Sequence, residues 1–310
     1  MRERTNHRSG GTQHIKKSGQ LLCQSIESRY NFVYTLETFL SIDRVCRILD
    51  ICRSGYYQWL KKLESKYSDG ELLEKVYNYF HNHKGKYGSR RILHLLRSEG
   101  IVINRKRVQR MMRQLNLKAE GKPKFKKTTK SNHKEAISPN LVNQNFNVDA
   151  PNRLHVSDIT YIPTREGWLY LMVVIDCFGR KVKTWSLRSS LTKEIVTEPV
   201  AELLKKEKPT QLIFHSDRGS QYASKVLRNI LQKFNVKQSM SSKGNCYDNA
   251  VAESFFKTLK YELSKKIFKT KKEAEIEIFE YIEMYYNSKR LHSSNNYKTP
   301  NQVYEEFKAA

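Results

Sequence analysis

Short runs of apolar residues, separated by turns, dominate the chain from about residue 154 onward. Three such runs follow closely, with turn residues at 165–167 and 178–180 between them. Helical patterns and two more short apolar runs come next. The predicted elements are strands at 154–163, 168–176 and 181–187, a helix at 192–206, a strand at 212–214, a helix at 223–234 and a strand at 236–240. This order predicts an α/β sheet.

A further helix is predicted from about residue 248 to 260. Val251, Phe255 and Leu259 recur every four residues and are expected to form its buried stripe. The opposite face carries Glu253, Lys257 and Lys260. Another helix is expected at 271–286, packing on the core or on a partner through its apolar residues Ile276, Phe279, Ile282, Met284 and Tyr285.

The pattern is helical from residue 41 to 117. Ser41 is a candidate N-cap for a helix with Val45, Ile48 and Leu49 on its apolar face. A break at 50–54 and a second helix follow, which suits either a small helix-turn-helix or an ordinary helical hairpin. A third helix is expected at 69–83.

Two more helices, joined by a short turn at Gly100, precede residue 117. Asn104 is expected to cap the second of them, with Val108, Met111 and Met112 facing inward. Its outward face carries Arg105, Lys106, Gln109, Arg110 and Arg113. Such a pair fits a helix-turn-helix that reads double-stranded DNA, and the alternative is a basic solvated face.

Charge and composition divide the chain further. The formal net charge is +26, most of it in residues 1–150, which favours a polyanionic partner. The stretch 118–134 holds seven lysines and a single acid. The predicted organisation is a poorly ordered segment at 1–40, a helical DNA-binding region at 41–117, a basic linker at 118–150 and a core at 151–310.

Cysteine usage and hydropathy narrow the function classes. Five cysteines form no CxxC pair, which speaks against a disulfide framework and against a zinc site. No apolar run approaches the ~18 residues of a membrane span. A cytoplasmic protein without membrane contact is therefore expected.

Three acids stand out by position. Asp158 lies in the first predicted strand, Asp217 follows the fourth, and Glu253 lies on the helix described above. Carboxylates at a strand end and on a helix can converge on a hard divalent cation, with Lys257 and Lys260 beside them for phosphate. Each acid alone could instead be a turn or capping residue.

Other polar residues leave two interpretations open. Asp176 is expected to be structural rather than a ligand, and Asp248 to cap a helix. His215 and His292 could contact DNA or support the site, or they could be hydrogen-bonded structural histidines.

Several motifs together carry a family resemblance. They are the segments 157–162 (SDITYI), 215–222 (HSDRGSQY), 239–241 (SMS), 243–245 (KGN), 248–250 (DNA), 253–256 (ESFF) and 259–260 (LK), and at the C-terminal end 286–292 and 297–300. In this order, with 35 residues between Asp217 and Glu253, they resemble the catalytic subunit of transposases of the insertion sequence 3 family, which share a DDE integrase core.

The resemblance implies a ribonuclease H-like α/β core with Asp158, Asp217 and Glu253 as catalytic residues and metal ligands. It further implies two Mg²⁺ ions, for which Mn²⁺ can substitute, and cleavage and strand transfer at the ends of an insertion sequence. The implied partners are double-stranded DNA, further copies of the chain on DNA, and an upstream, frame-encoded helix-turn-helix protein. The implied location is the bacterial cytoplasm, on the nucleoid.

Two positions depart from the family pattern. His155 stands where a tryptophan is usual, and Gly179 stands where a serine is usual. Both permit a decayed copy. The alternatives are therefore a catalytically silent DNA-binding relic and a metal-dependent nuclease without strand transfer.

Overall fold

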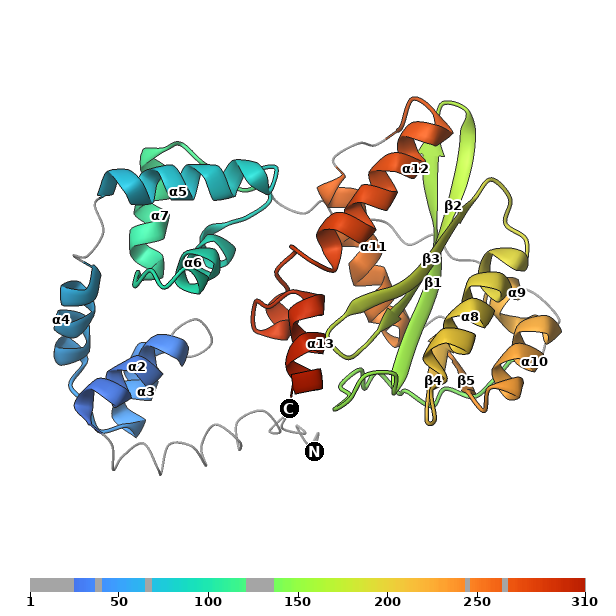
Figure 1. Cartoon of the computed structure of the whole chain (residues 1–310), viewed down its shortest axis with the longest axis horizontal. Coiled ribbons are helices and arrows are strands. Elements are labelled where there is room, and N and C mark those ends of the chain that lie inside the picture. Colours follow the sequence, from blue (N-terminus) through green and yellow to red (C-terminus); the bar gives the residue numbers. More distant parts are fainter. Residues whose placement is uncertain are drawn as a thin grey trace, which may run out of the picture. The chain divides into compact units, whose positions relative to one another are not determined.

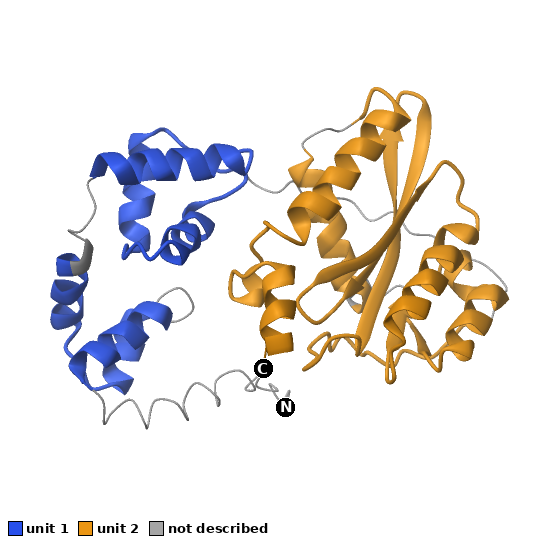
Figure 2. Cartoon of the chain, viewed as in Figure 1, with its two compact units in different colours: residues 1–120 blue, residues 121–310 orange. Residues whose placement is uncertain are grey.

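A computed structural model describes residues 25–36, 41–64, 69–120, 137–242, 246–263 and 267–309. The chain forms two compact units, residues 1–120 and 121–310 (Figure 2). The boundary falls inside the expected linker 118–150, and residues 121–136 lie outside the described ranges. Among the described residues, no helix has the length and apolar content needed to cross a membrane.

The first unit is helical. Its helices are α2 (Ile26–Leu36), α3 (Ile42–Ile48), α4 (Arg53–Glu64), α5 (Asp69–Asn82), α6 (Ser89–Ser98) and α7 (Arg105–Gln114). The predicted caps are confirmed, because Ser41 accepts a hydrogen bond from the Arg44 N–H and Asn104 accepts one from the Arg107 N–H. Helix α2 lies within the segment 1–40 that was predicted to be poorly ordered, so that prediction is wrong for residues 26–36. Its Tyr30 and Val33 are buried, which ties α2 to the rest of the unit.

The second unit is built on one mixed sheet (Figure 1). Its strands are β1 (Leu154–Thr164), β2 (Gly167–Asp176), β3 (Lys181–Arg188), β4 (Ile213–Ser216) and β5 (Lys237–Met240), in the spatial order β3-β2-β1-β4-β5. Strands β1, β2 and β3 pair antiparallel, whereas β4 runs parallel to both β1 and β5. The bounds of β1–β3 agree with the sequence prediction to within one residue.

Helices cover both faces of this sheet. Helices α8 (Glu194–Glu207) and α10 (Lys225–Lys233) pack on one face and α11 (Ala250–Glu262) and α12 (Lys271–Phe279) on the other (Figure 1), while the short α9 (Ser220–Ala223) follows β4. Successive residues of β2 alternate between the two apolar layers, because side chains of a strand point to opposite faces. Val173 joins the layer of α11, and Val174 joins that of α8. Buried layers on both sides explain why β2 is apolar almost throughout.

The predicted helix 271–286 packs on the core through only some of the apolar residues named for it. Ile282 is buried, whereas Ile276, Phe279 and Met284 are exposed by 47%, 49% and 59% of their surface. Among the described residues, the α-helix changes into a π-helix at Glu280–Tyr286, a change that the sequence pattern did not indicate. In α3 the predicted face is also corrected, since Ile48 is exposed.

Residues 137–150, assigned to the linker from sequence, pack on the sheet. The Leu141 N–H donates to the Ser239 Oγ at 2.9 Å, and the Met240 N–H donates to the Pro139 carbonyl at 3.4 Å. The segment therefore runs along β5 as part of the second unit.

Asp176 ties the end of β2 to α13 (Pro300–Ala309). Its fully buried carboxylate accepts hydrogen bonds from the Asn152 N–H at 2.7 Å, the Phe178 N–H at 2.9 Å and the Tyr304 hydroxyl at 2.5 Å. Burial acts to raise the pKa of Asp176, but contacts with His155, Tyr304 and Asn152 outweigh it and hold the pKa below its usual value. These contacts agree with the structural role that was predicted for Asp176.

Both departures from the family pattern belong to this region. His155 is fully buried, with its Nε2 3.1 Å from the Asn152 Oδ1 and 3.6 Å from Asp176. Gly179 has a φ of +68°, and a Cβ there would lie 3.2 Å from the Val303 Cγ1 of α13. Gly179 thus suits its surroundings, whereas the Nδ1 of the buried His155 has no hydrogen-bond partner among the described residues.

Tyr304→Phe should lower the free energy of unfolding by about 1–3 kcal/mol, because the buried Asp176 carboxylate loses a donor and gains none. Denaturant unfolding of the full chain measures this loss. The control is Tyr161→Phe, which removes the hydroxyl of a tyrosine that is 50% exposed. Equal stability of the two variants would contradict the role of this hydrogen bond.

Candidate active site

Asp158 and Asp217 lie side by side at the edge of the parallel strands β1 and β4. The last paired residues of this ladder are Ser157 and Ser216, and each acid is the next residue of its strand or of the loop that follows it. Neighbouring parallel strands end at the same edge of a sheet, so the two carboxylates are neighbours through backbone pairing alone.

Local hydrogen bonds fix both acids. The Asp217 Oδ1 accepts from the Gly219 N–H at 2.9 Å, and the Asp158 Oδ1 accepts from the Ile159 N–H at 2.8 Å. Beneath them, the buried Ser157 hydroxyl bonds the Val173 carbonyl and the Tyr222 hydroxyl, each at 2.8 Å. This serine joins β1, β2 and the helix after β4, so the position of Asp158 depends on all three.

The electrostatics show which groups converge. The pKa of Asp158 is raised well above its usual value, first by burial, then by the negative charge of Asp217, and further by Glu253. Lys260 acts in the opposite direction. Burial lowers the pKa of the Lys260 ammonium, which Asp158 counteracts. Two carboxylates and one lysine, from the end of β4 and from α11, therefore lie within electrostatic range of Asp158.

Helix α11 presents Glu253 to solvent. Phe255 and Leu259 are buried as predicted, and Val251 is half-buried, so the opposite face with Glu253 and Lys257 is exposed. Within the described ranges, no three His, Cys, Asp or Glu side chains lie close enough to hold a metal ion as they stand. In this conformation the three acids therefore do not form a metal-binding site.

The predicted DNA-reading residues lie on α7 in the first unit. Arg105, Lys106, Arg110 and Arg113 are exposed, and Gln109 is half-buried. Val108, Met111 and Met112 form the buried face, as the sequence predicts. The exposed surface of α7 is thus strongly basic.

Comparison with known proteins gives the family. Integrase core domains match residues 148–246 and 234–300, and an HTH-like domain matches residues 68–125. The transposase for insertion sequence element IS904 of Lactococcus lactis is 46% identical over 231 residues, which is 74% of this chain and 91% of that protein. Transposase InsF for insertion sequence IS3A of Escherichia coli is 36% identical over 272 residues, covering 86% and 94%. The chain belongs to the insertion sequence 3 family of transposases.

The transposase has the fold that the resemblance implied. Its strand order β3-β2-β1-β4-β5 and its integrase core are those of the ribonuclease H-like class. Among solved structures, the BIV integrase catalytic core shares 18% identity at a TM-score of 0.38, covering 51% of this chain and 97% of that one. The Mos1 mariner transposase catalytic domain shares 14% at 0.37, covering 42% and 70%. TM-scores this low are no evidence for the fold, so the fold assignment rests on the strand order and the family match.

Sequence reasoning missed the contacts that hold α11 at its N-terminal end. Asp248 is buried, and its carboxylate accepts from the Ser242 N–H at 2.7 Å, the Asn140 amide at 2.9 Å and the Gln144 amide at 3.1 Å. The expected helix cap at Asp248 is wrong, because Asn249 occupies the cap position and makes no side-chain cap bond. Asp248 instead joins the loop before α11 to the segment along β5.

A second buried carboxylate holds the C-terminal end of α11. Arg290 donates to Glu262 through its Nε and a terminal nitrogen, at 2.8–3.0 Å, and the Tyr281 hydroxyl donates to Glu262 at 2.9 Å. Both ionic side chains are almost fully buried, 3% and 4% exposed. Arg290 belongs to the C-terminal motif 286–292, so this motif anchors the helix that carries Glu253.

The two histidines that the sequence left open have structural contacts. His215 is fully buried, with its Nδ1 2.8 Å from the Ser239 Oγ and its Nε2 3.3 Å from the Ser241 Oγ. Burial lowers the pKa of His215. His292 is half-buried and lies 3.2 Å from Arg290.

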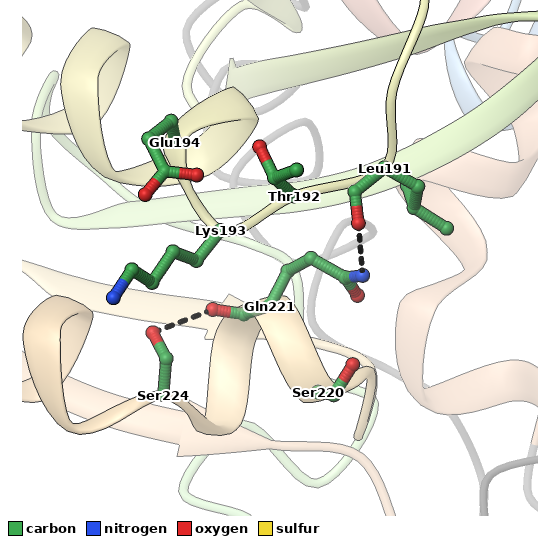
Figure 3. Close-up of a pocket in the computed structure, with 7 residues that line it drawn as sticks. All are labelled: Leu191, Thr192, Lys193, Glu194, Ser220, Gln221 and Ser224. Atoms are coloured by element: carbon green, nitrogen blue, oxygen red, sulfur yellow. Dashed lines mark hydrogen bonds between the residues drawn. The ribbon is translucent and has the colours of Figure 1, made fainter.

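A cavity of about 410 Å³ is lined in part by residues that follow Asp217 closely in the sequence (Figure 3). Its lining comes from the start of α8 and from α9, the helix that follows Asp217. The Gln221 amide donates across it to the Leu191 carbonyl at 3.1 Å, as Figure 3 shows. None of Asp158, Asp217 and Glu253 lines this cavity.

The Glu262–Arg290 pair should show strong coupling in a double-mutant cycle. Glu262→Gln and Arg290→Met should each cost about 3–5 kcal/mol, because each leaves the partner charge buried. The double variant should lose at least about 2 kcal/mol less than the sum of the two.

Urea unfolding of the full chain supplies the four free energies. The control cycle uses Lys272→Met and Glu275→Gln, an exposed pair whose coupling should stay below about 1 kcal/mol. Additive losses at 262 and 290 would refute the anchor.

Proposed function

We propose that this transposase cleaves and joins DNA at insertion-sequence ends in a reaction that depends on divalent metal ions, with Asp158, Asp217 and Glu253 as catalytic residues. The observation that carries the proposal is the convergence of these three carboxylates, from β1, the end of β4 and α11. Membership of a transposase family with an integrase core supports it.

The three acids suit two Mg²⁺ ions, which Mn²⁺ can replace. Their donor set consists of oxygen only, which hard divalent cations prefer. Burial and then the charge of Asp217 raise the pKa of Asp158, and a bound cation would favour its ionised form. Glu253 is exposed, so a rotamer change can bring its carboxylate to the pair of aspartates. When bound, such ions activate a hydroxyl nucleophile and stabilise the leaving oxygen of a phosphodiester.

The residues of the chain supply position and charge. Lys260 lies close enough to Asp158 to influence its pKa, so its ammonium is held beside the site. In that place it can hold a phosphate of the element end that is being cleaved. Lys257, one turn beyond Glu253 and exposed, serves as a backbone contact for the same DNA.

DNA is recognised by the first unit. We assign base and phosphate contacts to Arg105, Lys106, Gln109, Arg110 and Arg113 of α7, which form an exposed, basic surface within the HTH-like match. The chain would act in the cytoplasm, on nucleoid DNA, as a homo-oligomer at the two element ends. The upstream, frame-encoded partner belongs to the same proposal.

Asp158→Asn, Asp217→Asn and Glu253→Gln should each reduce Mg²⁺-dependent cleavage of element ends by about a hundredfold or more while leaving DNA affinity unchanged. Asp158→Asn should also raise the thermal midpoint in chelator, because it removes a crowded charge. Mg²⁺ should raise the midpoint of the wild type and of none of these variants.

Cleavage assays and thermal melts with and without Mg²⁺ make these measurements. The control is Glu202→Gln, the same change at an exposed site on α8. If one of the three variants keeps the wild-type cleavage rate, the residue replaced in it is not a metal ligand.

Lys260→Ala should depress cleavage of the element's own ends by about tenfold, and nicking of unrelated duplexes by less. Lys260→Arg should recover part of the loss, because the charge is kept. The two losses are compared in a paired cleavage assay on cognate and scrambled duplexes at one salt concentration. Lys225→Ala, at an exposed lysine of α10, should change neither rate. Equal losses on both duplexes would make Lys260 a general electrostatic contact.

A further inference from the structure

We propose that α3 and α4 form a second DNA-reading module, which binds double-stranded DNA next to the stretch read by α7. This inference rests on the proposed function and extends it, because the HTH-like family match begins at residue 68 and leaves α3 and α4 outside. Two observations carry it: a polar face on α4, and a fixed connection between the two modules.

The turns after α3 and α6 permit a helix-turn-helix in both places, with a hydrogen-bond pattern that also ends α7 and α10. After α3, the Asp50 N–H donates to the Arg47 carbonyl and the Ile51 N–H to the Cys46 carbonyl, at 3.4 and 3.1 Å. After α6, residues 100 and 101 make the same pair of bonds to residues 97 and 96, at 3.0 and 3.1 Å. Both turns place a residue in the left-handed region, Asp50 at φ +49° and Gly100 at +77°. Each turn leads into a helix with basic residues, α4 or α7.

Helix α4 has one buried and one polar face. Tyr56 and Leu60 are almost fully buried, and Gly55 lets α2 approach closely, since a Cβ there would overlap the Tyr30 hydroxyl. The exposed residues at positions i, i+4, i+7 and i+8 are Ser54, Gln58, Lys61 and Lys62. Helices that enter the major groove carry this composition, because an amide reads base edges and lysines bind phosphate.

Tyr34 of α2 holds the two modules together. Its hydroxyl accepts from the Ile103 N–H at 3.1 Å, and its carbonyl accepts from Arg97 at 3.0 Å. The Arg97 guanidinium also lies 3.6 Å from the centre of the Tyr34 ring. These contacts attach α2, on which α3 and α4 pack, to the turn between α6 and α7. Since the modules are joined in this way, their DNA contacts should fall at a fixed spacing.

Part of the module's charge is already paired. Asp43 lies 2.5 Å from Arg47 within α3 and 3.9 Å from Arg53, and the second contact joins α3 to α4. The test therefore uses Gln58 and Lys61, which are exposed on the face that would meet DNA. Because both are exposed, their replacement by alanine should leave the fold and its thermal midpoint unchanged.

The experiment is hydroxyl-radical footprinting of the full chain on a duplex that carries the element's terminal sequence. Wild type should protect two neighbouring blocks. Gln58→Ala and Lys61→Ala should each lose one block and about tenfold in affinity, and Arg110→Ala should lose the other. Lys61→Ala should also reduce the log–log salt slope by about 1, whereas Gln58→Ala should not.

The matched control is Lys272→Ala, which removes the same charge beside Glu275 on α12 and should leave both blocks intact. An unchanged footprint and an unchanged affinity in both α4 variants would overturn the proposal. Helices α3 and α4 would then serve only as structural support for α6 and α7. An unchanged footprint in Arg110→Ala alone would instead refute the role assigned to α7, so the two failures are distinguishable.

Discussion

The close approach of two carboxylates, one within β1 and one just after β4, is the constraint around which the second unit is organised. Asp158 and Asp217 are placed side by side by strand pairing, and burial and then the charge of Asp217 raise the pKa of Asp158. In the isolated fold this contact opposes stability, so apolar layers on both faces of the sheet must offset it. A site of this kind is suited to cations before any ion arrives.

The remaining carboxylate of the set is held by different means. Glu253 is exposed on a helix whose two ends are anchored by buried carboxylates, Asp248 and Glu262. Each buried charge is surrounded by donors, which makes its replacement costly and its position specific. Asp248, just before α11, and Glu262, at its end, therefore hold the helix in place, whereas Glu253 remains exposed on its surface.

Much of the fold could be predicted from local pattern. The apolar runs and turns in 154–187 and the caps at Ser41 and Asn104 are short-range signals, and the structure confirms them. The motif around Asp158, Asp217 and Glu253 pointed to the family. The catalytic roles of these residues stay predictions.

What failed from sequence depends on distant partners or on a change of helical period. No local pattern indicates that Arg290 reaches Glu262, or that Asp248 meets Asn140, because those partners lie 28 and 108 residues away. The apolar pattern of 271–286 likewise did not indicate which of its residues face the core, or that the helix changes its period at 280–286. Such features follow from the assembled core rather than from the segment itself.

The bond between Asp176 and Tyr304 joins residues 128 positions apart and gives the second unit an order of assembly during synthesis. When β1 and β2 have been synthesised, the Asp176 carboxylate is present but its donor Tyr304 is not. The core gains this donor only when α13 has emerged from the ribosome. A chain that ends before residue 304 would keep a buried carboxylate with one donor fewer, and its lower stability would favour degradation.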